Sequence, residues 1–141
     1  MIVDGESFLG GFAGGFLARG FTRIGYGLYF TTLRVIGIDL GSHGGGAIGT
    51  MAGFIEGQLM PQLAPEESMR VVNWLDGMKE FDMTKDQIQH IEIKKPGAFG
   101  SGHIIFKSTD GKSEKIVLRH RTAYDRLCTL TKAFSPELVN E

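Results

Sequence analysis

The sequence has few of the residues that mark secreted or metal-binding proteins. Cys128 is the single cysteine among 141 residues, so the chain has neither an internal disulfide nor a cysteine-based zinc site. None of the four histidines stands in a His-x-x-x-His or His-Glu-x-x-His pattern, the spacings that place two zinc ligands on one helix face. We therefore expect neither a metal nor a cofactor.

The sequence also lacks an excess of charge of one sign. Fifteen lysines and arginines balance 16 aspartates and glutamates, whereas nucleic-acid-binding domains usually carry a strong basic excess. No run of 18 apolar residues could cross a membrane, and Asp4 and Glu6 stand where a signal peptide would be basic. We expect a cytoplasmic protein that binds no nucleic acid, with peripheral attachment to the inner membrane surface as the alternative location.

A recognisable catalytic motif is missing too. No spacing indicates a Ser–His–Asp or Cys–His arrangement, and residues 97–102 resemble a phosphate-binding loop without the Gly-Lys-Ser/Thr that completes one. Cys128 flanks an apolar stripe and is expected to be a small buried residue rather than a nucleophile. We predict that the chain is not an enzyme; a small enzyme with an unrecognised site is the alternative.

Glycine is abundant and unevenly distributed. Sixteen of the 21 glycines lie in residues 1–57, and glycine makes up about twice its usual share of a globular protein. Charged residues are distributed the opposite way, with seven in residues 1–60 and 24 in residues 61–141. The first part is therefore glycine-rich and apolar, and the second has the composition of an ordinary domain.

Two segments carry helical patterns. Residues 122–134 begin with a capping-box-like pair, Thr122 and Asp125. The apolar positions of this segment recur every three or four residues, at Tyr124, Leu127, Leu130 and Phe134. Residues 65–78 open with a proline and two glutamates and end near a glycine, which favours a helix with those bounds.

Other segments are rich in β-branched and aromatic residues and are predicted to be strands: 27–31, 33–38, 104–106 and 116–118. Asp110-Gly111 is a turn signal that joins the last two as a hairpin. Ile91 and Ile93 alternate with charged residues, as in a half-buried strand. Ile88 is out of phase with them, which predicts a bulge near Gln89-His90.

The first stretch, residues 8–21, is ambiguous. Phe8, Phe12 and Phe16 are spaced by four, as on a helix, but each of the four glycines between them would destabilise a helix by about 1 kcal/mol. We interpret this stretch as an irregular or bulged strand.

Three groups of residues stand in a recognisable order. Residues 27–37 (GLYFTTLRVIG) form a hairpin motif with tyrosine, threonine and arginine, and residues 83–93 (MTKDQIQHIEI) form a polar strand entry with spaced isoleucines. Gly5-Glu6 and Arg19-Gly20 bracket a first strand. Together with Asp110-Gly111 and the last helix, these motifs resemble the GRAM and bacterial pleckstrin-homology-like (PH-like) domain family. The resemblance covers roughly residues 5–40 and 80–135.

The resemblance implies a strongly bent antiparallel sheet, a half-barrel or barrel, with one end closed by the C-terminal helix. The expected fold class is therefore α+β, mainly antiparallel β, in a single PH-like domain over residues 1–141. Residues 41–79 depart from the family pattern, because they stand between two strands where a short turn would suffice. We expect this insertion to form a pair of helices.

Within the insertion, glycines recur at a strict spacing of four residues, at Gly41, Gly45, Gly49, Gly53 and Gly57. On a helix these positions share one face, which would let a second helix backbone approach closely. We predict self-association through the last four of these glycines. The alternatives are an irregular loop, a helix packed on its own domain, or contact with a membrane.

Basic side chains gather at several places where an anion could bind. Arg19 and Arg23 lie in the connection after the first strand, where the resemblance places the basic residues of lipid-binding relatives. Lys94 and Lys95 end a strand, and Arg119-His120-Arg121 precede the last helix. Each base near an anionic membrane contributes about 1 kcal/mol, so two or three give weak, salt-sensitive attachment. The alternative is that these basic residues are solvated strand ends that bind no anion.

We therefore predict a non-enzymatic PH/GRAM-like binding module that acts through protein–protein contact or self-association. Its expected partner is another protein or a second copy of itself in a homo-oligomer. The alternative function is a peripheral membrane module that binds anionic lipid headgroups. The residues predicted for that alternative are Arg19, Arg23, Lys94 and Lys95.

Overall fold

The structure is a computed structural model that describes residues 6–14, 16–19, 25–39, 65–98 and 100–140. The strands in these ranges are β1 (Phe8–Gly14), β2 (Leu17–Ala18), β3 (Tyr26–Thr31), β4 (Arg34–Asp39), β5 (Phe81–Thr84), β6 (Ile88–Lys94), β7 (Gly102–Ser108), β8 (Ser113–Leu118) and β9 (Val139–Asn140). The helices are α3 (Pro65–Met78) and α4 (Arg121–Phe134), with short 3-10 turns η1 (Lys85–Gln87) and η2 (Pro136–Leu138). The predicted α+β class is confirmed.

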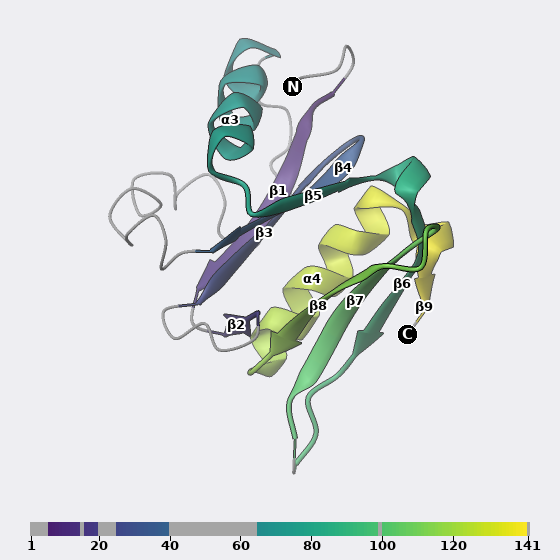
Figure 1. The fold of residues 1–141 in the computed structure, drawn as a ribbon. Helices are drawn as coiled ribbons and strands as arrows, with labels where there is room; N and C mark the ends of the chain where they lie inside the picture. The colour runs from purple at the N-terminus through teal and green to yellow at the C-terminus, as the bar shows by residue number, and fades with distance from the viewer. Residues whose placement is uncertain (1–5, 15, 20–24, 40–64, 99, 141) are drawn as a thin grey trace.

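The described strands form two sheets that are not joined to each other into a closed barrel (Figure 1). The first sheet has the order β1-β3-β4-β5, and the second has the order β2-β8-β7-β6-β9. Paired strands are antiparallel, apart from β6 and β9, which run parallel. The predicted bulge is confirmed, because the pairing of β6 with β7 shifts register between Ile88 and His90. This arrangement is consistent with the bent sheet expected from the sequence.

The chain passes from the first sheet to the second between β1 and β2. β1 pairs with β3 in the first sheet, whereas β2 pairs with β8 in the second. Glycine makes this path possible, because Gly10 at a register shift and Gly14 at the end of β1 have φ angles of 146° and 150°. The interpretation of this stretch as a bulged strand is therefore confirmed for its described residues.

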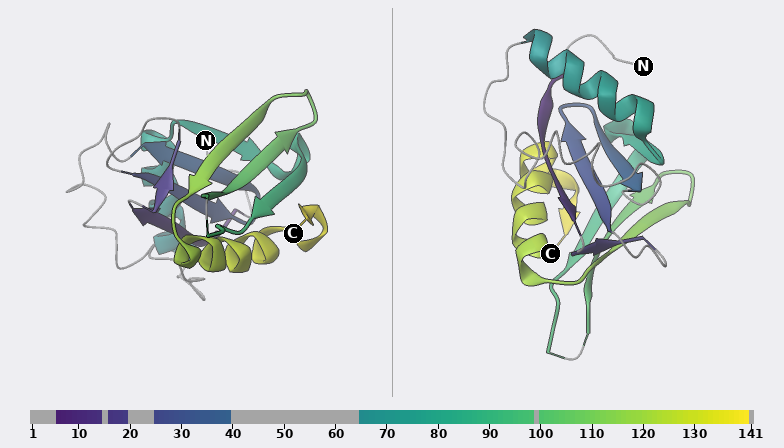
Figure 2. Two further views of the ribbon diagram at one scale, coloured as in Figure 1. Left: turned by 90° about the horizontal axis from the view of Figure 1, so that it is seen from below. Right: turned by 90° about the vertical axis from the view of Figure 1, so that its left-hand side faces the viewer.

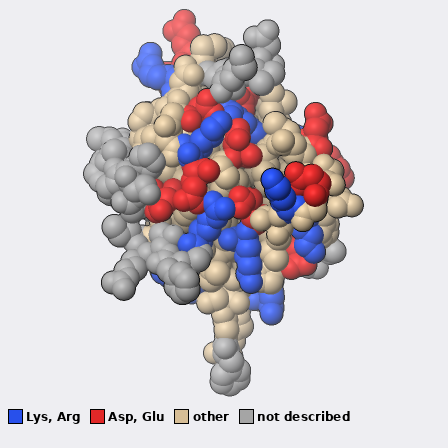
Figure 3. Space-filling model, in the orientation of Figure 1, with Lys and Arg blue, Asp and Glu red and all other residues tan. Residues whose placement is uncertain are grey.

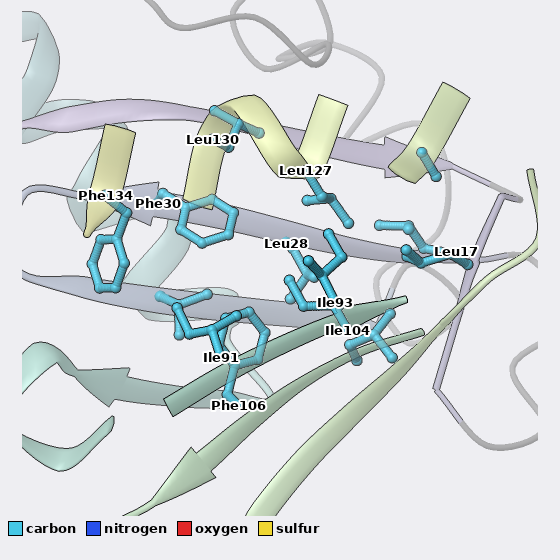
Figure 4. Close-up of a cluster of buried hydrophobic side chains, with 14 of the residues drawn as sticks. Leu17, Leu28, Phe30, Ile91, Ile93, Ile104, Phe106, Leu127, Leu130 and Phe134 are labelled. Atoms are coloured by element: carbon cyan, nitrogen blue, oxygen red, sulfur yellow. The ribbon is translucent and has the colours of Figure 1, made fainter. Parts of the chain in front are cut away.

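The main core lies between the two sheets, where α4 packs against both (Figure 4). The sheets contribute Leu28, Phe30, Ile91, Ile93, Ile104 and Phe106, and α4 contributes Leu127, Leu130 and Phe134. The helix therefore buries the apolar stripe predicted from its sequence. Each of these large side chains contributes on the order of 2 kcal/mol to the hydrophobic stabilisation.

A second core lies on the outer face of the first sheet, under α3. It contains Phe8, Tyr29, Ile36, Ile38, Val71, Val72 and Leu75. Because side chains alternate along a strand, β3 directs Leu28 and Phe30 toward α4 and Tyr29 toward α3. Figure 2 shows the two helices on different sides of the first sheet. The predicted bounds of α3 are confirmed, and its expected helical partner near residues 44–60 lies outside the described residues.

Tyr29 fills the space above two glycines of the neighbouring backbone. A Cβ atom on Gly11 or Gly27 would overlap the Tyr29 ring, so glycine is required at both positions. The Tyr29 hydroxyl is buried and has no hydrogen-bond partner among the described residues. Burial raises the pKa of this hydroxyl above its ordinary value of 10.

Replacing Tyr29 with phenylalanine is expected to raise the free energy of unfolding by about 1 kcal/mol, because the variant no longer buries an unpaired hydroxyl. The difference in the free energy of unfolding between the variant and the parent should widen above pH 10. There the unfolded chain ionises Tyr29 while the native chain keeps it protonated, so the parent loses stability that the variant retains. Urea denaturation at pH 8 and above pH 10 measures both effects; a destabilised variant would show that the hydroxyl is bonded.

The start of α4 differs from the prediction. Thr122 lies inside the helix, and the N-cap is His120, whose Nδ1 atom accepts a hydrogen bond from the Thr122 N–H at 3.0 Å. His120 takes this position because its backbone is extended and its ring nitrogen reaches the second helical N–H, as smaller N-cap side chains do. Within the described ranges, neither helix is long and apolar enough to cross a membrane.

Candidate functional site

Parts of the chain that are far apart in sequence meet at one end of the second sheet. The register places Gly102 opposite Leu118, and Leu118 opposite Leu17. The β6–β7 connection, the break before β2 and the start of α4 therefore lie within a few strand spacings of about 4.8 Å each. Figures 1 and 2 show the β6–β7 hairpin projecting at this end. We define the hairpin end as residues 16, 94–98, 100–101 and 119–121.

The hairpin keeps its two arms close together beyond the sheet. The Gly97 N–H donates to the Gly100 carbonyl at 3.0 Å. Gly102 is required at the base of the hairpin, because a Cβ atom there would overlap the carbonyl oxygen of Lys94 and the nitrogen of Pro96. Lys94 itself is exposed at this base. The backbone therefore carries the lysine and the tip away from the body of the protein.

An exposed aromatic ring lies beside the hairpin. The Phe16 side chain is 43% exposed and stacks on the His120 ring, with 4.7 Å between ring centroids and 19° between ring planes. The Phe16 carbonyl accepts a hydrogen bond from the Arg119 N–H at 2.7 Å, which fixes Phe16 against the end of β8. The stacking and the hydrogen bond therefore hold the partly exposed ring in one place at this end of the sheet.

Four exposed basic residues lie at this end of the second sheet: Lys94 and Lys95 at the hairpin base, and Arg119 and Arg121 on either side of His120. Two acids lie near them, and both have partners. Glu92 contacts His103 at 2.7 Å, and Asp125 contacts Arg121 at 4.0 Å. In Figure 3, lysine and arginine side chains gather over the lower part of the described surface, next to the projecting hairpin. The hairpin end is therefore basic, although the chain as a whole carries a net charge of −1.

Arg19 lies away from the hairpin end, in a cluster of its own. Its guanidinium donates to Glu80 and to Glu114, with Nη2 lying 3.0 Å from Glu114 Oε2, and it lies over the Phe81 ring at 5.1 Å from the centroid. The Tyr26 hydroxyl also donates to Glu80, at 2.9 Å. Arg19 thus connects β2, β5 and β8, and the structure does not bring it together with the hairpin lysines.

The charges of this cluster depend on one another. Burial on its own lowers the pKa of Arg19, and the hydrogen bond with Tyr26 and the carboxylates of Glu114 and Glu80 raise it to a greater extent. Burial and the hydrogen bond to Glu80 raise the pKa of Tyr26 above its ordinary value. Arg19 is therefore charged and Tyr26 is neutral, so the guanidinium holds Glu80 and Glu114 together.

Several predicted site residues lie outside the described residues. They are Arg23 and the glycines predicted for self-association, Gly45, Gly49, Gly53 and Gly57. Their predicted roles stay predictions. Among the predicted lipid-binding residues that are described, Lys94 and Lys95 lie together at the hairpin end and Arg19 does not.

Two of the described histidines, His103 and His120, have structural partners. His120 caps α4, and the Nε2 atom of His103 lies 2.7 Å from Glu92. The hydrogen bond with His103, helped by the charge of Lys107, lowers the pKa of Glu92. Cys128 is half-buried against the main core. In the described part of the chain, no three His, Cys, Asp or Glu side chains lie together in a way that could hold a metal ion.

Sequence reasoning found the basic residues of the hairpin end but missed Phe16. The sequence indicated only its spacing of four from Phe8 and Phe12, whereas β1 ends at Gly14 and the Phe16 ring is partly exposed. The glycines at positions 14 and 15 are the signal that could have separated Phe16 from the preceding strand. Comparisons with protein-family models, curated proteins and solved structures found no match to the chain.

Proposed function

We propose that the protein is a non-enzymatic binding module that attaches to anionic membrane surfaces through the hairpin end. The observation that carries the proposal is the presence of four exposed bases, from two separate segments, at the same end of the second sheet as an exposed phenylalanine and a projecting hairpin. The bases attract anionic headgroups, and the ring offers apolar area for the boundary between headgroups and acyl chains.

The architecture supports a binding module. The two sheets with the C-terminal helix packed against both are consistent with the strongly bent sheet closed by a helix that the PH-like resemblance implies, and such a scaffold presents loops and hairpins at its ends. In this protein, β6 and β7 run from the core directly into the projecting hairpin. Self-association through the glycine-spaced segment is a separate prediction that this proposal does not require.

The expected affinity is low and sensitive to salt. Each lysine or arginine near an anionic surface contributes about 1 kcal/mol, so the four bases together contribute about 4 kcal/mol. Inserting the Phe16 ring adds at most about 2–3 kcal/mol, since that is the gain for a fully buried side chain. Exposed charges are screened over about 8–10 Å at physiological salt, so binding should weaken as salt is added.

Sedimentation with vesicles tests the proposal. The protein should sediment with vesicles that contain phosphatidylserine and stay in solution with phosphatidylcholine alone. Replacing both lysines, Lys94→Glu and Lys95→Glu, should weaken binding by about tenfold or more, because two attractive charges become repulsive. Raising the salt concentration should release the parent protein.

A matched pair of substitutions separates a local effect from net charge. Arg70→Glu on α3 with Lys112→Glu at the β7–β8 turn changes the net charge by the same amount, at exposed positions away from the hairpin end. This control should bind nearly as well as the parent. Equal weakening by the two pairs, or no sedimentation of the parent at low salt, would rule out the hairpin end as the membrane site.

A further inference from the structure

The outer face of the second sheet follows from the alternation of side chains along its strands. The buried side chains of β6, β7 and β8 point toward α4 and belong to the main core. Because neighbouring residues of a strand point to opposite faces, the residues between them lie on the other side. We define the outer face as His90, Glu92, Lys94, His103, Ile105, Lys107, Ser113, Lys115 and Val117.

Neither described helix covers this outer face. α4 packs on the inner face of the second sheet, and α3 packs on the first sheet. The three lysines of the outer face are exposed, and its two apolar residues, Ile105 and Val117, are only partly buried. Antiparallel sheets commonly keep one face in solvent, so the charges of the face decide what it can bind.

The charges of the outer face are mostly of one sign. Each strand contributes one exposed lysine, Lys94 on β6, Lys107 on β7 and Lys115 on β8. Glu92 is the single acid of the face, and its carboxylate lies 2.7 Å from His103 Nε2 and 3.6 Å from Lys107 Nζ. In the described part of the chain, Lys94 and Lys115 have no carboxylate partner. An anionic partner would therefore meet two lysines without a competing acid.

The outer face continues into the hairpin end. Lys94 belongs to both, because it ends β6 at the base of the projecting hairpin. On the α4 side of the hairpin end, Arg121 has Asp125 as a partner at 4.0 Å. The exposed acids Glu66 and Glu67 open α3, which lies far from the hairpin (Figure 1). This distribution of charge turns the outer face, rather than either helix, toward an anionic surface.

We propose that an anionic membrane lies against the outer face of the second sheet, so that Lys107 and Lys115 contact headgroups together with Lys94. The inference rests on the proposed function and adds the orientation of the molecule to it. If the hairpin end alone touched the membrane, Lys107 would lie about 17 Å further away than Gly102, at about 3.4 Å per residue. Since exposed charges act over about 8–10 Å at physiological salt, Lys107 would then contribute nothing to binding.

Sedimentation with vesicles that contain phosphatidylserine tests this orientation. Lys107→Glu combined with Lys115→Glu should weaken binding about tenfold or more, because two attractive charges become repulsive. The matched control, Arg70→Glu combined with Lys132→Glu, reverses two exposed bases on α3 and α4 and should bind nearly as well as the parent. If the first pair does not fold, Lys107→Gln with Lys115→Gln should weaken binding about threefold or more.

Fluorescence quenching detects contact with the membrane at single positions. A dye is attached through Lys115→Cys in a Cys128→Ala background, and the vesicles contain a lipid with a nitroxide on its headgroup. The dye at position 115 should lose fluorescence on binding, because it faces the headgroups. The same dye attached through Arg70→Cys or Lys132→Cys should keep its fluorescence, because these positions lie on the helices.

Three results would overturn the inference and leave the hairpin end as the membrane site. They are equal binding by the outer-face pair and its control, equal quenching at the three labelled positions, and binding of soluble poly-glutamate that requires Lys107 and Lys115 while vesicle binding does not. The last result would assign the outer face to an acidic protein. A parent protein that stays in solution with anionic vesicles at low salt would overturn the proposed function and the inference together.

Discussion

Replacing Arg34 with methionine is expected to lower the free energy of unfolding by about 3–5 kcal/mol, because a buried carboxylate loses its counter-charge. Arg34 is 5% exposed, and its Nε atom donates to Glu6 Oε2 at 2.8 Å. The Glu6 side chain has no exposed area and also accepts from the Thr31 hydroxyl at 2.7 Å. Methionine fills much of the same volume but offers Glu6 no positive charge.

The same guanidinium joins further elements of the fold. Arg34 Nη1 donates to Asp76 of α3 and to Asp82 of β5, each at 2.8 Å, and Lys79 contacts both carboxylates. Burial on its own lowers the pKa of Arg34, and the hydrogen bonds to Glu6, Asp82 and Asp76 raise it to a greater extent. Hydrogen bonds from Lys79 and Arg34 lower the pKa of Asp76, so its contribution to stability is present above about pH 4 and is lost as the pH falls below it.

Urea denaturation at pH 7 measures the effect of Arg34→Met. Lys79→Met is the matched control, since it removes a cation from the same two aspartates at a position that is one third exposed. That control should change stability by less than about 1 kcal/mol. Adding Glu6→Leu to Arg34→Met should restore part of the loss, because the unpaired buried charge is then absent. Equal losses from Arg34→Met and Lys79→Met would contradict the prediction.

Replacing Phe134 with alanine is expected to lower the free energy of unfolding by about 3–5 kcal/mol, because it opens a cavity where α4 meets both sheets. The ring is 2% exposed and lies 5.6 Å from the Phe30 ring, measured between centroids. Phe30 in turn lies 6.3 Å from the Phe106 ring of the second sheet. The Lys85 ammonium lies over the Phe134 ring, 4.9 Å from its centroid.

Phe16→Ala provides the matched control for Phe134→Ala, since it makes the same chemical change at an exposed position. It should change stability by less than about 1 kcal/mol, as surface substitutions usually do. Both variants can be compared with the parent by thermal unfolding and by urea denaturation. A loss below about 1 kcal/mol for Phe134→Ala would mean that α4 does not close the core as described.

Local patterns predicted most of the described elements. The period of apolar residues in α4, the β-branched runs of β3, β4, β7 and β8 and the out-of-phase Ile88 each depend on neighbours in sequence, and each prediction is confirmed. The bounds of α3 follow from Pro65 and the glycine near its end. The buried face of α3 does not follow from residue hydrophobicity alone. Met69 is 53% exposed, whereas Ser68 is buried and accepts a hydrogen bond from the Phe8 N–H at 2.8 Å.

Contacts between distant segments explain what the sequence did not reveal. The division of the strands into two sheets depends on β2 pairing with β8, about 100 residues later in the chain. In the same way, Lys94 and Lys95 are recognisable as the end of a strand, but their place at the same end of the sheet as Phe16 follows from the registers of three strand pairs. Arg19 was predicted to bind a ligand. Its ion pairs with Glu80 and Glu114 could not be predicted, because both glutamates are remote in sequence.

The position of α3 has a consequence for how such a chain can change over evolution. Asp76 of α3 is one of three carboxylates that bind Arg34 of the first sheet, and Val72 and Leu75 belong to the same buried cluster as Tyr29. Loss of α3 would expose the apolar outer face of the first sheet and remove part of the counter-charge of a buried cation. A descendant without α3 would therefore need simultaneous replacements in β3 and β4, which ties the inheritance of this helix to that of the strands beneath it.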